Sequence, residues 1–499
     1  MTLELQLARL PESELEFGGS GYFRDPRRGL LEAGPFDLRF GSAHRAQIRL
    51  AIVGSSEMVD LALSWFERCR TPIADVTSED TRAAVPYTGF KSIFRSDLVC
   101  EPNLTVRIAQ DAIDRAIAMA PYDTFNEALK LYANAIIEAK RNSRPDVIVC
   151  AIPENLAKRV WSVQRPFSYA DQAALRRIEQ ATAQGQIELP LGWEPEEIAE
   201  DLLSRDFRRA LKATAMRFEI PIQIVRTNAL MDLRSNEPPA IRAWNLGTGL
   251  YYKAGGIPWR IPARGPETCF VGVTFHHLRT TRRQIVFSSL AQAYSSNGEG
   301  FTLKGSTLDP PEGRRRTPHM TSEQACELGR KVLDEYAKRN GAAPKRIVLH
   351  KSSRFTEDEH RGFSAAMSEV PVVQLVTISP TSVRLVTHSS YPPARGTLLT
   401  IENRRHYLFT SGFLGELGTY PGPHVPAPVE LRLEGNSTRS TLYEAATDVL
   451  ALGRLNWNTS DLRSSQPVTL GFARRVGGIM AEYGQMADND PDPNYRFYM

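Results

Sequence analysis

The stretch WNLGTGLYYKAGGIPWRI, residues 244–261, sets one lysine between a run of aromatic side chains and a tight glycine and proline turn. Gly255 and Gly256 allow positive φ and close backbone approach, while Pro258 fixes φ, so the turn after Lys253 has a single geometry. If the preceding apolar residues pack one side of a short helix, Lys253 is aimed across a domain boundary toward an anion. A surface lysine beside an ordinary turn is the simpler interpretation of this stretch taken alone.

The length and composition of the chain indicate a folded globular protein. Its 499 residues allow about three domains, or two large α/β domains, and 42% hydrophobic with 24% charged residues is an ordinary balance. The 61 Lys and Arg residues against 57 Asp and Glu residues give a net charge of only +4. A site for nucleic acid or phosphate must therefore come from a local basic patch rather than from the overall charge.

The cysteines indicate a reducing compartment. They are odd in number, widely spaced and form no CxxC pair, which favours buried thiols in a cytoplasm over zinc binding or a disulfide framework. The N-terminal residues carry acids and no long apolar core, which argues against a signal peptide, and no apolar run is long enough to span a bilayer. We therefore expect a cytoplasmic protein with no membrane partner. The five cysteines are Cys69, Cys100, Cys150, Cys269 and Cys326.

The first half of the chain has the pattern of an α/β domain. Residues 1–45 predict a lead-in segment that wraps a domain, and the strand predicted at 47–54 is followed by an amphipathic helix capped by Ser55 or Ser56. A glycine between strand and helix is typical of dinucleotide binding, but Gly54 stands alone without GxGxxG.

Further along this half, helical spacing alternates with apolar strands. Strands that are apolar on both faces indicate a parallel sheet covered by helices. A polar linker near residues 235–241 then closes a Rossmann-like first domain, for which we expect the bounds 46–240. The predicted helices are 104–119, 124–141 and 206–218, and the predicted strands are 145–153 and 219–226.

The second half, residues 241–499, predicts three consecutive strands, then a helix and another strand, then further strands and two terminal helices. This order is that of an RNase H-like fold. The predicted strands are 269–279, 284–294, 301–305, 346–350, 372–379, 383–388, 397–401 and 406–410. One predicted helix begins at the capping box of Thr321 and Gln324. The other predicted helices lie near 356–368, 438–452 and 467–482.

An RNase H-like nuclease needs carboxylates at the ends of its strands, because two Mg²⁺ ions must be held ~4 Å apart across the scissile bond. The first strand of this half offers Thr274 where an Asp is wanted, and the strand at 346–350 is followed by Ser352 where the second Asp is wanted. Neither hydroxyl replaces an anionic bridging ligand.

Four runs in this sequence resemble segments of the Argonaute family, and their combination is more specific than any one run. IVLHKSSRF and VGVTF resemble PIWI strands that have lost their Asp, and WNLGTGLYYKAGGIPW resembles the segment that joins MID to PIWI. LNWNTSDLRSSQPVTLGFARRVGGIM, residues 455–480, resembles the terminal helix pair. The resemblance covers residues 46–499 and is to short prokaryotic Argonautes, which have MID and PIWI only. It implies a broken catalytic tetrad, with Asn456 near the fourth position.

The resemblance also implies a pocket for the 5′-phosphate of a guide strand. In the family this pocket uses a basic or aromatic residue, a lysine four residues later, a glutamine, and a lysine from the PIWI side. The matching positions here are Arg208, Lys212, Gln223 and Lys253, with Arg208 in place of the usual Tyr or His. The family often adds a divalent cation, and we expect Mg²⁺ beside the carboxylate of Met499. Lys351 and Arg354 are candidates for contacts to the nucleic-acid backbone.

We therefore expect a guide-directed sensor. A 5′-phosphorylated guide, expected to be RNA, pairs with single-stranded DNA, and base pairing reads the sequence. The resemblance implies binding without cleavage and a heterodimer with an APAZ-containing effector of TIR, Sir2 or nuclease type, with a higher oligomer on activation. It also implies defence against plasmids or phage.

Two other classes of function stay open from the residues. A slicer would need a displaced set of carboxylates, and a nucleotide-binding enzyme of Rossmann type would use Gly54. The displaced set would come from Glu299, Asp309, Asp448 and Asp461.

Overall fold

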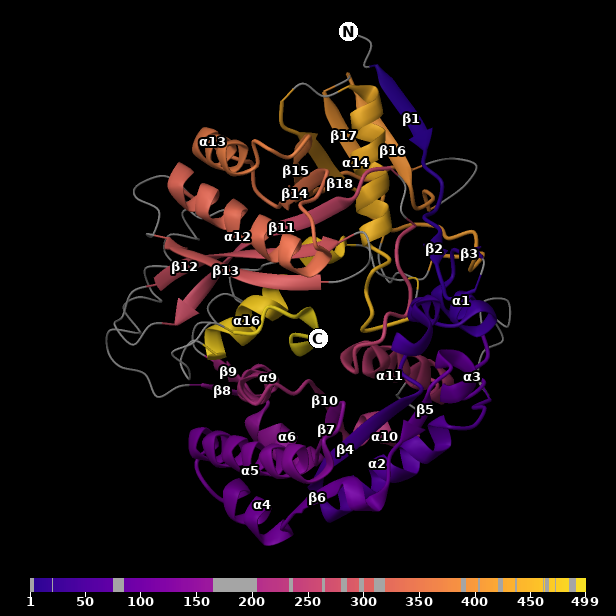
Figure 1. Ribbon diagram of the computed structural model, residues 1–499, viewed down its shortest axis with the longest axis vertical. Helices are drawn as coiled ribbons and strands as arrows, with labels where there is room; N and C mark the ends of the chain where they lie inside the picture. Colours follow the sequence, from indigo (N-terminus) through magenta and orange to yellow (C-terminus); the bar gives the residue numbers. More distant parts are fainter. Residues whose placement is uncertain are drawn as a thin grey trace.

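The structure is a computed structural model, and its elements form two α/β domains joined by a central helix (Figure 1). The residues that it describes are 4–19, 21–74, 85–164, 204–232, 237–262, 265–279, 285–295, 300–308, 319–386, 392–402, 404–420, 425–435, 438–460, 462, 466–471, 473–483 and 491–499.

The first domain contains a five-stranded sheet in which every pairing is parallel, in the order β10-β7-β4-β5, with β6 also pairing with β4. The predicted strand before the first helix is β4, and Ser55 caps the helix that follows it. This is the Rossmann-like arrangement expected from the apolar strands. The strands are β4 (Gln47–Ser55), β5 (Asp97–Val99), β6 (Thr105–Ile108), β7 (Val147–Ile152) and β10 (Ile222–Arg226).

Helices cover both faces of this sheet. Successive strand residues point to opposite sides, so the apolar strands present an apolar surface on each face. On one face Ile148 and Cys150 lie in a cluster with Phe125 of α5, and on the other Val147 and Val149 share a cluster with residues of α2 and α3. The helices of the domain are α2 (Ser56–Cys69), α3 (Phe90–Phe94), α4 (Gln110–Ile117), α5 (Pro121–Ser143), α6 (Glu154–Val160), α9 (Phe207–Arg217) and α10 (Thr227–Leu230).

The helix predicted at 104–119 is partly wrong. Its first residues form the strand β6, which pairs with the C-terminal part of β4, and the helix α4 begins only at Gln110. Val106 and Ile108 alternate with polar residues over too few positions to distinguish a strand from a helix start. The short strands β8 (Ser162–Gln164) and β9 (Ser204–Asp206) pair antiparallel, and the polar stretch between them lies outside the described residues.

The second domain contains a nine-stranded sheet in the order β1-β16-β17-β18-β15-β14-β11-β12-β13. Its β11, β12 and β13 are antiparallel neighbours, while β14 and β15 run parallel to β11, which is the RNase H-like order. The strands are β11 (Thr268–Arg279), β12 (Ile285–Ser295), β13 (Gly300–Leu308), β14 (Arg346–Lys351), β15 (Val372–Pro380), β16 (Thr397–Ile401), β17 (Arg405–Leu408) and β18 (Val429–Leu433).

Two helix layers cover this second sheet (Figure 1). Val271 and Val273 of β11 pack with α12 and α13, whereas Phe270 belongs to the cluster that includes α14 and α16. The capping box of Thr321 and Gln324 is present at the start of α12, as the sequence predicts. The helices are α12 (Ser322–Asn340), α13 (Glu357–Ala366), α14 (Arg439–Leu452), α15 (Val468–Gly471) and α16 (Ala473–Tyr483).

Two strand predictions in this domain differ from the structure. Residues 381–386 form no strand, so the predicted strand at 383–388 is absent over its described part, and β18 was not predicted. In β18 the sequence VELRL alternates apolar and charged residues, but it follows a proline-rich segment that is typical of a loop.

The N-terminal segment joins the second domain. β1 (Leu5–Arg9) pairs antiparallel with β16 and forms the edge of the nine-stranded sheet. Beyond it come the hairpin of β2 (Leu15–Glu16) and β3 (Tyr22–Phe23), the helix α1 (Pro26–Ala33) and the 3-10 helix η1 (Phe36–Ala43). This segment is bound to the stretch after the central helix, since Phe36 donates its backbone N–H to Pro258.

The central helix α11 (Pro239–Lys253) connects the domains and ends at Lys253, as the opening stretch predicts. It begins with a proline at its first turn, inside the region predicted as a linker. Trp244 and Tyr251 are almost fully buried in the core cluster that contains residues of both domains. Within the described part of the chain, no helix is long and apolar enough to cross a membrane.

Candidate functional site

The helix α9 brings the first two predicted residues to the junction of the domains. Asp206 caps α9 by accepting the backbone N–H of Arg209, which fixes where the helix begins. Phe207 and Leu211 are fully buried, so Arg208 and Lys212, one turn apart, share the adjoining face of the helix. Arg208 is exposed and Lys212 is partly buried.

Gln223 lies on β10, the edge strand of the first sheet, opposite Val149 of β7. Its side-chain nitrogen donates to the carbonyl of Ile224 at 3.1 Å. The amide oxygen accepts a hydrogen bond from Nζ of Lys253, the last residue of α11. This bond joins the first domain to the central helix, so two of the four predicted residues are in direct contact.

Lys253 is only 3% exposed, and its neighbours on α11 explain why the side chain has one orientation. Tyr251 stacks on Phe94 with ring centroids 5.0 Å apart, and Tyr252 stacks on Trp457 at 4.5 Å. Gly256 follows in a place where a Cβ would lie 2.3 Å from the Tyr251 ring. The rigid turn predicted from the sequence is therefore present, and both aromatic neighbours of Lys253 are held by stacking.

The C-terminal residues reach the same place. Nζ of Lys212 donates to the carbonyl oxygen of Tyr498 at 3.4 Å. Met499, predicted to contribute a carboxylate to a cation site, is 4% exposed and lies in the core cluster with Tyr498. Figure 1 shows the C-terminus between α16, α9 and α11. Met499 therefore directly follows the residue, Tyr498, whose main-chain carbonyl contacts Lys212.

The electrostatics of this cluster are those of a buried and a partly buried lysine beside an exposed arginine. Burial, and then the nearby charge of Arg208, lower the pKa of Lys253 to about 7. Burial, followed by the charges of Lys253 and Arg208, lowers the pKa of Lys212 well below its ordinary value of 10.5. The charge of Asp206 acts to raise the pKa of Lys212, but this effect is smaller than the effects that lower it. An anion placed here would raise both pKa values.

Three further arginines, Arg209, Arg226 and Arg475, adjoin this cluster and were not predicted. Arg475 of α16 and Arg226 at the end of β10 act on Arg208 as positive neighbours, and Arg475 also acts on Lys212. The guanidinium of Arg226 lies over the Trp161 ring at 4.8 Å. Arg226 follows Gln223 by three residues and could have been noticed, whereas nothing in the local sequence of α16 distinguishes Arg475.

The positions predicted to have lost their carboxylates lie side by side. The last register pair of β11 and β14 joins Val273 and Lys351, so Thr274 and Ser352 are the next residues on adjacent parallel strands. The Thr274 hydroxyl is buried without a hydrogen-bond partner among the described residues. The Ser352 carbonyl accepts the hydroxyl of Ser379 at 2.9 Å.

Asn456, predicted to lie near the fourth position, makes local contacts. Its amide groups contact Thr459 and the backbone of Asn458, and the adjacent Trp457 packs on α11. The part of the terminal region that reaches this end of the sheet is α15. Thr469 bonds His350 of β14 at 2.9 Å, and its carbonyl lies 1.8 Å from where a Cβ of Gly272 would be.

Lys351, predicted to contact a nucleic-acid backbone, points into the core instead. It is 1% exposed, and its ammonium donates to both oxygens of the buried Glu359 at 2.6 Å. It also lies over the rings of Phe275 and Phe355 at 5.1 and 5.5 Å. A backbone phosphate has no access to this ammonium. Arg354, in the following loop, is exposed as expected for such a contact.

Of the four carboxylates of the alternative slicer, Asp448 lies within the described residues. Asp448 accepts from Arg346 at 2.6 Å, at the N-terminal end of β14. Because a strand rises about 3.3 Å per residue, this end lies roughly 20 Å from Ser352, which follows the other end. Glu299, Asp309 and Asp461 lie outside the described residues.

Gly54, the basis of the dinucleotide alternative, stands where a Cβ would lie 2.5 Å from the carbonyl of Ala151 on the neighbouring strand. Close strand packing therefore accounts for this glycine. The described residues contain no group of three or more His, Cys, Asp and Glu side chains that could hold a metal ion.

Comparison with known proteins gives the fold. No protein-family model and no curated protein matches the chain. It is similar to the solved structure of Clostridium butyricum Argonaute bound to a guide DNA (5′ deoxycytidine) and a 19-mer target DNA, with 13% identity and a TM-score of 0.63. It is also similar to Aa-Ago with externally bound siRNA, with 13% identity and a TM-score of 0.55.

These similarities cover 97% and 99% of this chain but 54% and 56% of the two solved chains, so the chain spans about half their length. The parallel first sheet and the mixed second sheet correspond to the MID and PIWI regions. The chain therefore has an Argonaute-like fold.

Proposed function

We propose that the cluster of Arg208, Lys212, Gln223 and Lys253 anchors the 5′-phosphate of a guide strand. The observation that carries this proposal is the hydrogen bond from Lys253 to Gln223 beside Lys212, which assembles the cluster from both domains. Buried like charges are costly unless an anion accompanies them. A phosphate dianion supplies that charge and accepts several charge-assisted hydrogen bonds.

The same fold supports the rest of the proposal. The similar Clostridium butyricum Argonaute holds a guide DNA and a target DNA. For this chain we propose a short 5′-phosphorylated RNA guide and a single-stranded DNA target, with base pairing reading the sequence. Arg475 and Arg226 would extend the positive surface from the anchored phosphate along the guide backbone.

We propose further that the chain binds its target without cutting it. Thr274 on β11 and Ser352 directly after β14 occupy the positions where a nuclease needs two carboxylates. Guide-loaded protein incubated with complementary DNA and Mg²⁺ or Mn²⁺ should leave the DNA intact. Cleavage at one position opposite the guide would instead favour the slicer.

Mg²⁺ forms part of the proposal as a companion of the guide phosphate. The contact of Lys212 with the Tyr498 carbonyl supports a place for it, because Met499 follows directly. Phosphate oxygens and water would supply most ligands, since Mg²⁺ accepts few protein groups. Chelation with EDTA should weaken binding of phosphorylated guides and leave binding of 5′-hydroxyl guides unchanged.

The output of the sensor is proposed to come from a separate APAZ-containing effector in a heterodimer that acts in defence against plasmids or phage. The effector would be of TIR, Sir2 or nuclease type. The resemblance to short prokaryotic Argonautes supports this step. Co-expression with the product of the neighbouring gene, followed by assays for NAD consumption and DNA degradation with guide and target, would test it.

The anchoring site is tested by competition between 5′-phosphorylated and 5′-hydroxyl oligonucleotides of one sequence. Lys212→Ala with Lys253→Ala should abolish the preference for phosphate. Lys91→Ala with Lys130→Ala, which removes two exposed lysines of the same domain, is the matched control and should retain it. A double variant that folds and keeps its preference would remove the site.

A further inference from the structure

The strand β1 forms one edge of the nine-stranded sheet. Among the described strands it pairs only with β16, and Figure 1 shows it on the outside of the second domain. The other edge strand, β13, is partly covered, because Thr302 donates its backbone N–H to Pro493 of the C-terminal segment at 2.7 Å. An edge strand with free backbone groups is a template for pairing with another chain.

The backbone hydrogen bonds at the two ends of β1 fix which residues face outward. Leu10 donates its N–H to Gly396 at 2.9 Å, and Glu4 accepts the N–H of Glu402 at 3.0 Å in the same register. In an antiparallel pair, residues that bond the neighbouring strand alternate with residues that point away from it. The even-numbered residues therefore bond β16, and no described residue bonds the outward N–H and C=O groups. The outward residues are Leu5, Leu7 and Arg9.

The outward residues also carry exposed apolar side chains. Leu5 and Leu7 are 55% and 58% exposed. They lie with Arg9 on one face of the strand, because side chains alternate between the two faces. Leu399, opposite Leu7 on β16, is only 6% exposed. The apolar row on this face of the sheet therefore continues to the edge strand and ends there in solvent.

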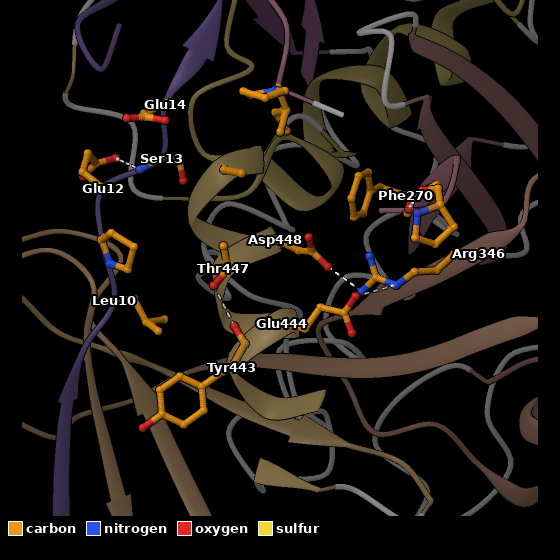
Figure 2. Close-up of a pocket in the computed structure, with 16 residues that line it drawn as sticks. Leu10, Glu12, Ser13, Glu14, Phe270, Arg346, Tyr443, Glu444, Thr447 and Asp448 are labelled. Carbon is orange, nitrogen blue, oxygen red and sulfur yellow. Dashed lines mark hydrogen bonds and ion pairs between the residues drawn. The ribbon is translucent and has the colours of Figure 1, made fainter. Parts of the chain in front are cut away.

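The opposite face of β1 is directed toward α14. Leu10 continues the row of even-numbered side chains and lines a cavity together with Tyr443 and Thr447 of α14 (Figure 2). A chain that docks on β1 would therefore extend the sheet from its edge and cover the face that carries Leu5 and Leu7.

A positive charge lies at the C-terminal end of this edge. Arg9 is exposed, has no ion-pair partner among the described residues, and lines a cavity of about 330 Å³. Of the other charged lining groups, Arg395 pairs with Glu12. Arg24 lies 3.6 Å from Glu416. Arg9 is therefore left as the unpaired charge, and a carboxylate is the group that complements it.

We propose that β1 binds an extended segment of another protein, which adds to the sheet antiparallel to β1 and places an acidic side chain opposite Arg9. The segment residues opposite Leu5, Leu7 and Arg9 would exchange backbone hydrogen bonds with them. Apolar side chains at the first two of these positions would cover the leucines. Antiparallel pairs predominate in sheets, and this direction puts the acidic residue at the N-terminal end of the segment. The surface does not depend on the proposed guide anchor.

A second copy of this chain would not supply the carboxylate. Directly opposite residues of an antiparallel ladder have their side chains on the same face of the sheet. The other residues of β1 on the face of Arg9 are Leu5 and Leu7. Two β1 strands paired antiparallel would therefore place a leucine opposite each Arg9. The charge of Arg9 selects a different, acidic partner.

Fluorescence anisotropy with a labelled peptide tests the proposal on the full chain. The probe is the N-acetylated hexapeptide Glu-Thr-Val-Thr-Val-Thr, labelled at its C-terminus, whose glutamate and two valines match Arg9, Leu7 and Leu5 in turn. Saturable binding is expected below about 1 mM. A lysine in place of the glutamate should weaken binding about fivefold, because like charges then lie opposite each other. Absence of saturable binding, or equal binding of the two peptides, would overturn the proposal.

Methylation of the peptide's backbone nitrogens tests the pairing itself. In the expected register the N–H groups of the two valines donate to β1, whereas those of the first two threonines point away from it. N-methylation of both valines should abolish binding, and N-methylation of those two threonines should preserve it. Equal effects of the two modifications would contradict strand addition.

Variants of the chain locate the binding. Arg9→Glu should reverse the preference, so that the lysine peptide binds more tightly than the glutamate peptide. Arg330→Glu, at an exposed position on α12, is the matched control and should leave the preference unchanged. Leu7→Pro removes an outward N–H, which an edge strand tolerates, and should abolish binding. If Leu7→Pro fails to fold, Arg9→Glu decides: a variant that is folded by circular dichroism and keeps the original preference would remove the site.

Two further measurements separate the other possible occupants. In sedimentation velocity without peptide, a dimer that Leu7→Pro abolishes would assign the edge to a second copy of the chain and overturn the proposal. Saturating 5′-phosphorylated oligonucleotide should not displace the peptide. Displacement would assign peptide binding to the basic cluster and would equally overturn the proposal, whereas the proposed guide anchor would stand.

Discussion

Lys253, a buried residue, would couple the proposed phosphate binding to proton uptake. Its pKa of about 7 means that in the folded chain it is only partly charged at neutral pH, although an exposed lysine would be fully charged. A phosphate bound to Gln223 and Lys253 favours the ammonium and raises that pKa. Binding at alkaline pH therefore requires the uptake of a proton.

We predict that affinity for a 5′-phosphorylated strand falls as pH rises from 7.5 to 9, by up to about tenfold per pH unit for one proton taken up. The free-state pKa of about 7 for Lys253 sets the lower edge of this window. Fluorescence anisotropy across the range measures it. A 5′-hydroxyl strand of the same sequence should show a shallower slope, and equal slopes would contradict the coupling.

At the residue scale, the sequence was informative where spacing carried the signal. Arg208 and Lys212 share a helix face, and the turn after Lys253 follows from its glycines, so these positions could be predicted. Lys351 could not, because a lysine at the end of a strand has the same sequence pattern whether it points to solvent or to Glu359. Its burial depends on how α13 packs on β14, which no local pattern records.

At the scale of elements, the contact between β14 and α13 depends on that same buried pair. Burial acts to raise the pKa of Glu359, but hydrogen bonding from His319 and the charge and hydrogen bonds of Lys351 lower it to about 2. The folded-state pKa thus lies below the ordinary 4.5. The pair contributes stability above pH 4.5, and that contribution is lost as pH falls toward 2.

We predict that Glu359→Gln lowers the free energy of unfolding by roughly 3 kcal/mol at pH 7, because it leaves the Lys351 ammonium buried beside a neutral amide. Urea unfolding followed by circular dichroism measures this loss. Glu357→Gln, at an exposed position on the same helix, is the control and should change stability little. A loss no greater than the control's would show that the pair contributes nothing net.

The contact between α15 and β11 gives a second test at this scale. A Cβ on Gly272 would lie 1.8 Å from the Thr469 carbonyl, so backbone must move to accept it. We predict that Gly272→Ala destabilises the chain by roughly 2–4 kcal/mol. Gly415→Ala, with no atom within 4 Å of the added carbon, should be near neutral. Thermal unfolding of both variants checks this, and equal midpoints would argue against the contact.

Element order was more predictable than element ends. The RNase H-like succession of β11, β12, β13, α12 and β14 follows from periodicity and from the capping box at Thr321. The strands β6 and β18 were missed because they are short, with four and five residues. In addition, β6 pairs with a strand that is distant in the sequence, and β18 follows a proline-rich loop. Short strands gain their stability from the sheet rather than from their own residues.

For the whole molecule, the basic cluster joins elements from both domains. Lys212 comes from α9, Gln223 from β10 and Lys253 from the helix between the domains, while the C-terminal residues contact Lys212. In the proposed site, a bound anion would contact all of these elements together. It should therefore stabilise their relative position as well as each side chain.

We predict that a 5′-phosphorylated strand slows amide hydrogen exchange in α9, β10, the end of α11 and residues 495–499 together. The reason is that local opening of any one of them would break a contact with the phosphate. Exchange followed by mass spectrometry measures this, with the 5′-hydroxyl strand as control. Protection confined to α9 would contradict an anchor shared between the domains.

The path of the chain at its beginning has a further consequence. Because β1 lies at the edge of the second sheet and α11 leads back to that sheet, the first domain is an insertion within the second. Two chain crossings connect them, and the bridge of Glu16 with Arg260 ties one crossing to the other. A rotation between the domains would have to bend both at once. Two chain segments therefore connect the domains, rather than one hinge. The distance between Lys212 and Lys253 depends on these two connections as well as on side-chain packing.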